Sequence, residues 1–424
     1  MSNFKIKLSL YLNYFVFAIL LNSVGTVILM VQKSYNISKS HASILEPFKD
    51  LSIAIVSFLI TSFITRIGYK KAMLIALGFV SLVCFIMPLT HGFLMTELLF
   101  ASVGSCFALI KISVFASIGL VTKDEKDHLS FMNFLESVFG VGVLAGYFIF
   151  PLFINKNNPG STEWLNVYYL LGGISLAAFF LLLSSTLDES AAKAEISDNM
   201  LQDFTKMFTL FVKPIVLVFI VSVFLYVLLE QSIMSWLPTF NNDVLKINEV
   251  LSIQMASILA GSIALGRFLA GILLRKMKWV VLLISCLVVA TAIVLISMPI
   301  IKNFIVAYHG SGITSLKDVP VVAYAFPLIG LVLAPIYPAI NSVVLSSLPK
   351  PQHGLMSGLI IVFSALGGTT GSLITGSIFQ YYGGQSAFYL SLVPITGLIF
   401  TLMIFSRLHN KQATATSFKN MKAH

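Results

Sequence analysis

Twelve long apolar stretches dominate this 424-residue sequence. Each holds roughly 20 residues, enough for a helix to cross a hydrocarbon core about 30 Å thick. Lipid offers no hydrogen-bonding partner to backbone groups, and the sequence lacks the alternation of barrel strands, so the stretches are predicted to be helices. Their approximate limits are 8–31, 43–65, 71–90, 93–121, 128–153, 164–187, 211–236, 249–274, 279–300, 319–347, 354–379 and 385–406.

The overall composition excludes a soluble globular protein, because 57% of the residues are hydrophobic and only 10% are charged. The first stretch follows Lys5 and Lys7, as the core of a signal peptide would. It is too long for that role, however, and no small-residue cleavage site follows it. We therefore interpret it as the first membrane helix.

The net charge of +10 does not indicate a nucleic-acid partner, because its distribution is typical of a membrane protein. If the loops alternate between the two sides of a bilayer, 18 of the 27 Lys and Arg residues fall on the side that holds both termini, and six fall on the other side. Cytoplasmic loops carry such an excess. The bias predicts a multi-pass protein of the cell (inner) membrane with both termini in the cytoplasm.

A polar segment divides the chain into two similar halves. We predict an N-terminal six-helix bundle over 1–187, a cytoplasmic linker over 188–210, a C-terminal six-helix bundle over 211–406 and a cytoplasmic tail over 407–424. The second span is followed by Arg-Ile-Gly-Tyr-Lys-Lys and the eighth by Arg-Lys-Met-Lys. A basic turn at the same place in both halves is typical of parallel repeats.

The spans, the division into halves and the basic turns resemble the major facilitator superfamily. The first turn keeps Arg66, Gly68, Lys70 and Lys71 of that family's pattern, but Thr65 stands where the family has an Asp. The resemblance implies an all-α membrane protein of twelve transmembrane helices in two pseudo-symmetric bundles. It also implies transport by alternating access.

The second half resembles one branch of the family, the fucose/glucose/galactose–proton symporters. The similarity is carried by Gly266-Arg267, Tyr337-Pro338, Gly367-Gly368 and the Ser-Trp-Leu-Pro sequence that begins at Ser235. Members of that branch carry an Asp in the first helix and a Glu in the fourth. Here Gly25 takes the place of the Asp, and Ile110 or Lys111 that of the Glu.

Lys111 is the strongest candidate for a substrate-binding residue, since it lies deep in the span 93–121. A cation at that depth is costly unless it has a partner or lines a wet cavity. It either binds an anionic solute or pairs with a carboxylate, for which Glu136 in the fifth span is at a suitable depth. Glu136 is alternatively a cytoplasmic gate residue or a buried proton carrier.

Other polar residues within spans complete the candidate sites. Arg267 either binds an anion directly or forms a structural pair or gate at the cytoplasmic end of the eighth span. Glu230 with Gln231 is a candidate for the cavity or an outer gate. Glu46, Lys49 and Asp50 share one helical face. We interpret them either as a solvated vestibule or as a proton-coupling or gating group. Asn22 and Asn341 either contact substrate or bond neighbouring helices.

These residues favour a secondary active transporter that imports a small anionic organic solute: a carboxylate, a polycarboxylate or its metal chelate. The two cations, Lys111 and Arg267, are better suited to binding an anionic solute than to binding a neutral sugar. Coupling to protons is expected, and the protein is expected to be a monomer. The alternatives are a neutral sugar–proton symporter and an exporter of a small metabolite. The sequence carries no phosphate loop or zinc-protease motif, so we predict no enzyme, catalytic residue, cofactor or metal site.

Overall fold

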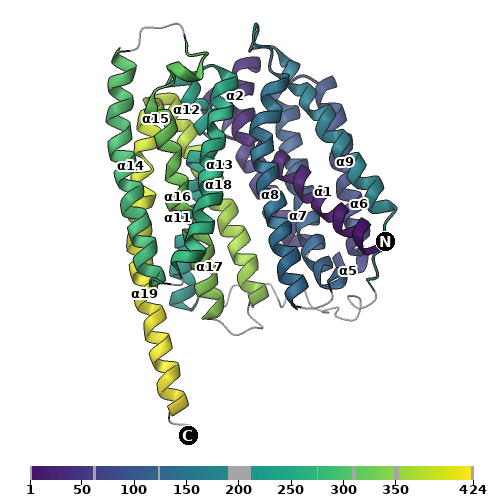
Figure 1. Ribbon diagram of the computed structural model, residues 1–424, viewed down its shortest axis with the longest axis vertical. Coiled ribbons are helices and arrows are strands. Elements are labelled where there is room, and N and C mark those ends of the chain that lie inside the picture. Colours follow the sequence, from purple (N-terminus) through teal and green to yellow (C-terminus); the bar gives the residue numbers. More distant parts are fainter. Residues whose placement is uncertain are drawn as a thin grey trace. The chain divides into compact units, whose positions relative to one another are not determined.

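The computed structural model describes residues 2–60, 64–122, 125–189, 212–274, 276–307, 312–347 and 353–421, and most of them are helical (Figure 1). Within these residues, eleven helices are long and apolar enough to cross a membrane. Helix α4 (Leu45–Ile60) occupies most of the remaining predicted span, of which residues 61–63 lie outside the described part. The predicted all-α membrane fold is confirmed, and the helices agree with the predicted twelve spans.

The chain divides into two compact units. The first holds Met1–Asp198 together with Ser235–Ser257, and the second holds Asn199–Met234 and Ile258–His424. A short segment from the second half of the sequence therefore belongs to the first unit. Most of the predicted linker lies within 190–211, outside the described residues. The boundaries of the two bundles and of the tail remain predictions.

The first unit is built from pairs of long helices. The most extensive contacts are those of α4 with α7, of α1 with α8, and of α6 with α7 and α9. Its elements are α1 (Ser2–Asn22), α2 (Val24–Tyr35), α3 (Lys39–Ala42), α4, α5 (Ile64–Ile67), α6 (Tyr69–Ile86), α7 (Phe93–Val121), α8 (Glu125–Ile149), α9 (Val167–Leu183), α12 (Leu237–Asp243) and the start of α13 (Glu249–Leu273).

The first predicted span is interrupted at Ser23, between α1 and α2. Asn22 Nδ2 donates to the carbonyl of Ala18, and Ser23 Oγ donates to that of Leu20, both at 2.8 Å. Side chains that bond to nearby carbonyls compete with the regular helical ladder and bend it. The polar pair Asn22-Ser23 explains the break, which hydropathy alone did not predict.

In the second unit, α11 packs against both α18 and α19. The predicted span 319–347 is broken into short helices, because Pro327 and Pro335 lack the N–H that a continuous helix needs. The elements of this unit are α11 (Pro214–Met234), the rest of α13, α14 (Trp279–Ala307), α15 (Val321–Ala325), α16 (Ile329–Leu333), α17 (Ile336–Ser346), α18 (His353–Tyr389) and α19 (Leu392–Met421).

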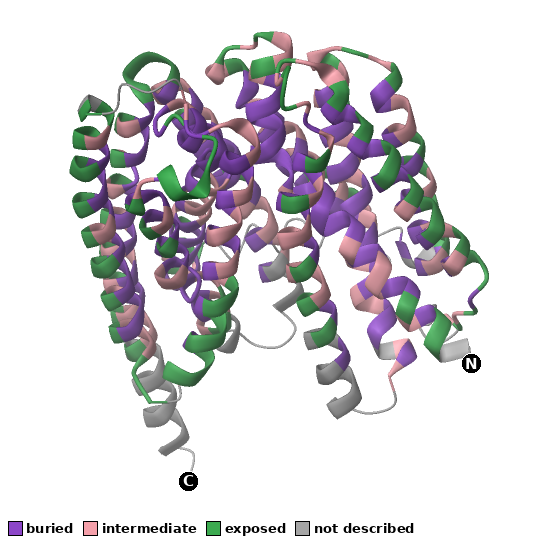
Figure 2. Ribbon diagram, turned by 45° about the horizontal axis from the view of Figure 1, so that its top comes forward, coloured by how far each residue is buried: buried purple, intermediate pink, exposed green. Residues whose placement is uncertain are grey.

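Exposed apolar side chains follow the outer faces of the helices, as helix α14 shows. Val281, Val288 and Leu295 recur every seven residues along it, and each is about half exposed. Figure 2 shows the same separation of exposed and buried residues along the helices of each unit. Water would penalise such a surface, whereas lipid does not. The pattern supports a position within a membrane.

Glycines allow helices to approach each other closely in both units. A Cβ atom on Gly104 of α7 would lie 2.3 Å from the carbonyl oxygen of Lys49 on α4. In the second unit, a Cβ on Gly371 of α18 would lie 2.4 Å from the carbonyl oxygen of Leu228 on α11. These contacts leave no room for a side chain, so each glycine fixes the spacing of a helix pair.

We expect Gly104→Ala to destabilise the protein by about 1–3 kcal/mol, the usual cost of overpacking, because the methyl group has to push α7 away from α4. Thermal unfolding of the purified protein measures the effect. Gly140→Ala on α8 is the matched control, since a Cβ there meets nothing within 4 Å. Equal stability of the two variants would contradict the close approach at Gly104.

Candidate functional site

Lys111 of α7 lies beside an aromatic cluster in the first unit. Its side chain is half-buried, and Nζ lies 5.9 Å from the centroid of the Phe107 ring. Tyr14 of α1 and Phe139 of α8 pack around Phe107, with ring centroids 6.4 and 6.1 Å from it. Among the described residues, the buried Tyr14 hydroxyl has no hydrogen-bond partner. The cluster thus combines one cation, one hydroxyl and several apolar rings.

Glu136 does not form the predicted ion pair with Lys111 in the described part of the chain. Its carboxylate is near enough to act electrostatically on Lys111 and on Tyr14. Its side chain is exposed on α8, so the interpretation of Glu136 as a buried carboxyl is wrong for this conformation. Lys111 therefore has a nearby opposite charge but keeps its ammonium free to bind an anion.

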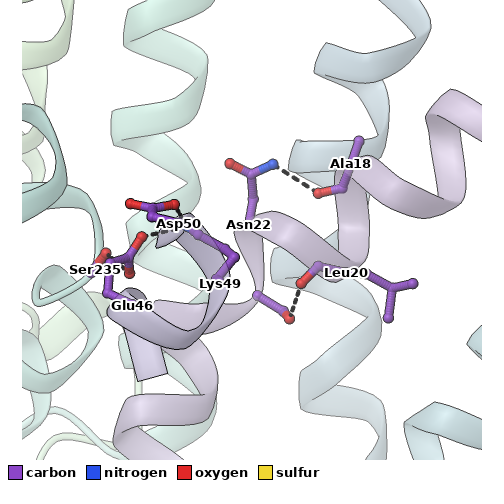
Figure 3. Close-up of polar contacts among 8 residues, drawn as sticks. Ala18, Leu20, Asn22, Glu46, Lys49, Asp50 and Ser235 are labelled. Atoms are coloured by element: carbon purple, nitrogen blue, oxygen red, sulfur yellow. Dashed lines mark hydrogen bonds and ion pairs between the residues drawn. The ribbon is translucent and has the colours of Figure 1, made fainter. Parts of the chain in front are cut away.

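Glu46, Lys49 and Asp50 of α4 form a buried charged group, which we call the α4 triad. Their exposed fractions are only 0%, 5% and 8%. Glu46 pairs with Lys49 through Oε1, and Lys49 Nζ lies 3.4 Å from Asp50 Oδ1 (Figure 3). Ser235 Oγ donates to Glu46 Oε2 at 2.8 Å. The interpretation of these residues as a solvated vestibule is wrong, because Ser235 and the helices around α4 cover them.

Further polar contacts join α2 and α3 to the segment that carries Ser235. Lys33 pairs with Glu249 at 3.2 Å and Lys39 with Asp243 at 2.7 Å, while Gln32 Nε2 donates to Thr239 Oγ1 at 3.3 Å. The side chains of the two ion pairs are more exposed than those of the α4 triad. We call the two ion pairs the rim pairs. Together with the triad they hold the segment 235–249 on the first unit.

A second polar cluster lies within the second unit. The Tyr226 hydroxyl donates to Glu230 Oε1 at 2.8 Å, one turn along α11. Tyr226 stacks on Tyr337 of α17 at 5.6 Å between ring centroids, and the Tyr337 and Ser364 hydroxyls are 3.2 Å apart. Arg267 of α13 acts electrostatically on Glu230 and both tyrosines. The cluster offers hydroxyl groups, a carboxylate and a guanidinium.

The remaining candidates have mixed surroundings. Arg267 is exposed, whereas Gln231 and Asn341 are half-buried. Within the described residues, Asn341 Oδ1 is buried without a hydrogen-bond partner. Asn22, also half-buried, directs its amide nitrogen to its own helix (Figure 3). Of these side chains, Asn341 offers the clearest unused acceptor for a solute.

Sequence reasoning missed the aromatic partners of the charged residues. Tyr14, Tyr226 and Ser364 were not predicted. Tyr14 is near enough to Glu136 for an electrostatic effect, Tyr226 donates to Glu230, and Ser364 is within hydrogen-bond distance of Tyr337, which stacks on Tyr226. Tyr226 lies four residues before Glu230, a spacing that places two side chains on one helical face. That spacing could have identified Tyr226. Nothing in the sequence pairs Ser364 with Tyr337 or Tyr14 with Phe107.

The chain matches the model of the Major Facilitator Superfamily over residues 10–316. The protein belongs to this superfamily. The predicted family is thereby confirmed, and the family consists of transporters rather than enzymes. A comparison with curated protein sequences gave no match.

Solved structures show the same fold at low sequence identity. The chain is similar to the D323A mutant of the nucleoside transporter NupG, with a TM-score of 0.74, 14% identity and coverage of 94% of this chain and 99% of that one. The D-xylose-proton symporter matches with a TM-score of 0.69 and 12% identity, over 95% of this chain and 97% of that one. FucP in the outward conformation matches with a TM-score of 0.61 and 13% identity, over 96% of this chain and 99% of that one.

Proposed function

We propose that this transporter imports a small anionic organic solute by alternating access, and that the movement of protons drives it. The solute is a carboxylate, a polycarboxylate or its metal chelate. The observation that carries the proposal is Lys111, a half-buried cation with no ion pair among the described residues. An unpaired ammonium inside the unit is costly. A bound anion offsets that cost through charge-assisted hydrogen bonds.

The aromatic cluster strengthens this proposal. The Phe107 ring lies beside the half-buried Lys111, and an ammonium-to-anion contact is stronger in partly apolar surroundings than in bulk water. The Tyr14 hydroxyl is an additional donor within the aromatic cluster around Phe107. An anion with an apolar part can therefore contact the cation and the rings together.

Support for proton coupling comes from the buried carboxyl groups and from similar structures. One of these structures is a D-xylose-proton symporter, and another was described in connection with substrate recognition in proton dependent oligopeptide transporters. Lys and Arg residues are three times as frequent in the loops on the side of the termini as in those on the other side, which supports insertion in the inner membrane with both termini cytoplasmic. The protein works as a monomer in this proposal, since each unit carries its own polar cluster.

A neutral sugar is the second candidate, because of the cluster around Tyr226. Stacked tyrosines offer apolar faces to a sugar ring, and Glu230 accepts hydrogen bonds from hydroxyl groups. That cluster does not need Lys111. The two candidates therefore differ in which variant abolishes binding.

A thermal-shift screen of the purified protein tests the proposal. We expect organic acids or their chelates to stabilise the native protein, by about 2.7 kcal/mol at 100 times the dissociation constant. Lys111→Met is expected to remove most of this stabilisation, while Tyr226→Phe leaves it in place. Stabilisation by sugars alone, unchanged in Lys111→Met and lost in Tyr226→Phe, would favour the neutral sugar instead.

A further inference from the structure

The α4 triad carries an uneven number of charges. Two carboxylates, Glu46 and Asp50, share one ammonium, that of Lys49, and all three residues are almost completely buried. If every group kept its usual ionisation, the triad would hold one unbalanced negative charge. An unbalanced charge in an apolar interior costs several kcal/mol. One more positive charge is needed while the triad is covered.

The two carboxyl groups differ in their contacts. Both oxygens of Glu46 have partners, Lys49 Nζ on Oε1 and Ser235 Oγ on Oε2 (Figure 3). Among the described residues, the ion-pair contact of Asp50 is the longer one to Lys49, at 3.4 Å. Asp50 is therefore the carboxyl group on which an added proton is the better tolerated.

Other ionisable groups lie on the elements packed around the triad. Besides its own members, the ionisable groups on the packed helices include Glu97 and Lys111 of α7 and Lys33 of α2. The segment after Ser235 adds Asp243, Lys246 and Glu249, of which the two acidic residues form the rim pairs. In the described part of the chain, none of these groups forms an ion pair with Lys49 or Asp50.

Space around the triad is also limited. The backbone of Gly104 lies against the Lys49 carbonyl, leaving no room even for a methyl group. Ser235, which donates to Glu46, and Thr239 of the same segment are almost fully buried, with exposed fractions of 1% and 0%. A proton needs no space and no coordination shell, whereas a metal cation needs several oxygen ligands. The geometry favours a proton over a metal ion.

We infer that the α4 triad is a proton-binding site, in which Asp50 takes up one proton from water as the segment carrying Ser235 closes over Glu46. When the segment leaves, water reaches the triad and Asp50 releases the proton. The inference rests on the proposed proton-driven transport and assigns its proton to Asp50, rather than to Glu136 or Glu230. Closure is then favoured at low pH and opposed at high pH.

A cysteine reporter tests this inference without knowledge of the solute. Thr239 is fully buried, so Thr239→Cys in a protein whose native cysteines are replaced by alanine reacts with a thiol reagent only when the segment opens. The rate is divided at each pH by that of Lys156→Cys on an exposed loop, which corrects for thiolate formation. We expect the ratio to rise up to about tenfold per pH unit once Asp50 titrates, the value for a single proton.

The variants decide the outcome. Asp50→Asn needs no proton, so its reporter ratio is expected to stay low and independent of pH. Lys39→Met removes a rim pair and is expected to retain the pH slope, although its ratio is higher throughout. Asp50→Glu, expected to keep the slope with a shifted midpoint, serves if the Asn variant does not fold. A flat ratio in the parent protein, or an unchanged slope in Asp50→Asn, overturns the inference.

The carbonyl stretching band of a protonated carboxylic acid gives a second measurement. Infrared difference spectra between low and high pH are expected to show one such band, lost in Asp50→Asn and kept in Glu230→Gln. Loss in Glu230→Gln instead would place the proton in the second unit. The Lys111 thermal-shift screen is independent of both readings, so a failure of the anion proposal is distinguishable from a failure here.

Discussion

Lys49→Met is expected to destabilise the protein by about 3–5 kcal/mol at neutral pH, the usual loss when a buried ionic group loses one partner. The variant leaves Glu46 and Asp50 together in a buried place without their cation. Protonation of the carboxyl groups relieves the repulsion, so the variant regains stability as the pH falls. Thermal unfolding between acid and neutral pH, followed by circular dichroism, measures both effects.

Two controls separate this effect from a general loss of an ion pair. Lys39→Met breaks a rim pair whose side chains are 25% and 29% exposed, so it should cost only about 0–1 kcal/mol. The triple variant Glu46→Gln, Lys49→Met, Asp50→Asn removes all charges of the triad and should recover much of the stability. If Lys49→Met is as stable as Lys39→Met, the triad is not buried as described.

Hydropathy and charge bias predicted most of the fold, because in lipid each span satisfies its own backbone. The limits of α7, Phe93–Val121, agree with those predicted. The breaks within the spans were harder to predict from the sequence. A window of twenty residues averages over Ser23 and Pro335, although each ends a helix. The assignment of Ser235–Ser257 to the first unit depends on packing between distant parts of the chain, which the sequence pattern does not contain.

For the candidate sites, the sequence identified the charged residues but not the side chains that contact them. Charge within a span identified Lys111, Glu230 and the α4 triad, since burial of a charge demands a reason. Their partners were not identified in the same way. Ser235 lies 189 residues from Glu46, and the Ser-Trp-Leu-Pro sequence that it begins indicated a family resemblance but no contact with α4. Whether an identified charge is covered or exposed, as for Asp50 and Glu136, follows from tertiary packing alone.

Transport itself is expected to respond most strongly to a reversal of charge at Lys111. Lys111→Glu removes the cation proposed to bind the solute and places a carboxylate beside the aromatic cluster and near Glu136. A hydrogen bond to a charged group contributes about 1.5–3 kcal/mol. Losing it and adding repulsion should reduce accumulation of an anionic solute about 100-fold or more, since each 1.4 kcal/mol is tenfold.

Uptake of the acid found in the thermal-shift screen, by proteoliposomes with an imposed pH gradient, measures this reduction. Lys156→Glu makes the same change of charge on an exposed loop and should leave uptake unchanged. Lys111→Arg keeps the cation and should retain part of the activity, although a guanidinium is larger and more rigid than an ammonium. Full uptake by Lys111→Glu would show that Lys111 does not bind the solute, and the cluster around Tyr226, Glu230 and Arg267 would then become the site to test.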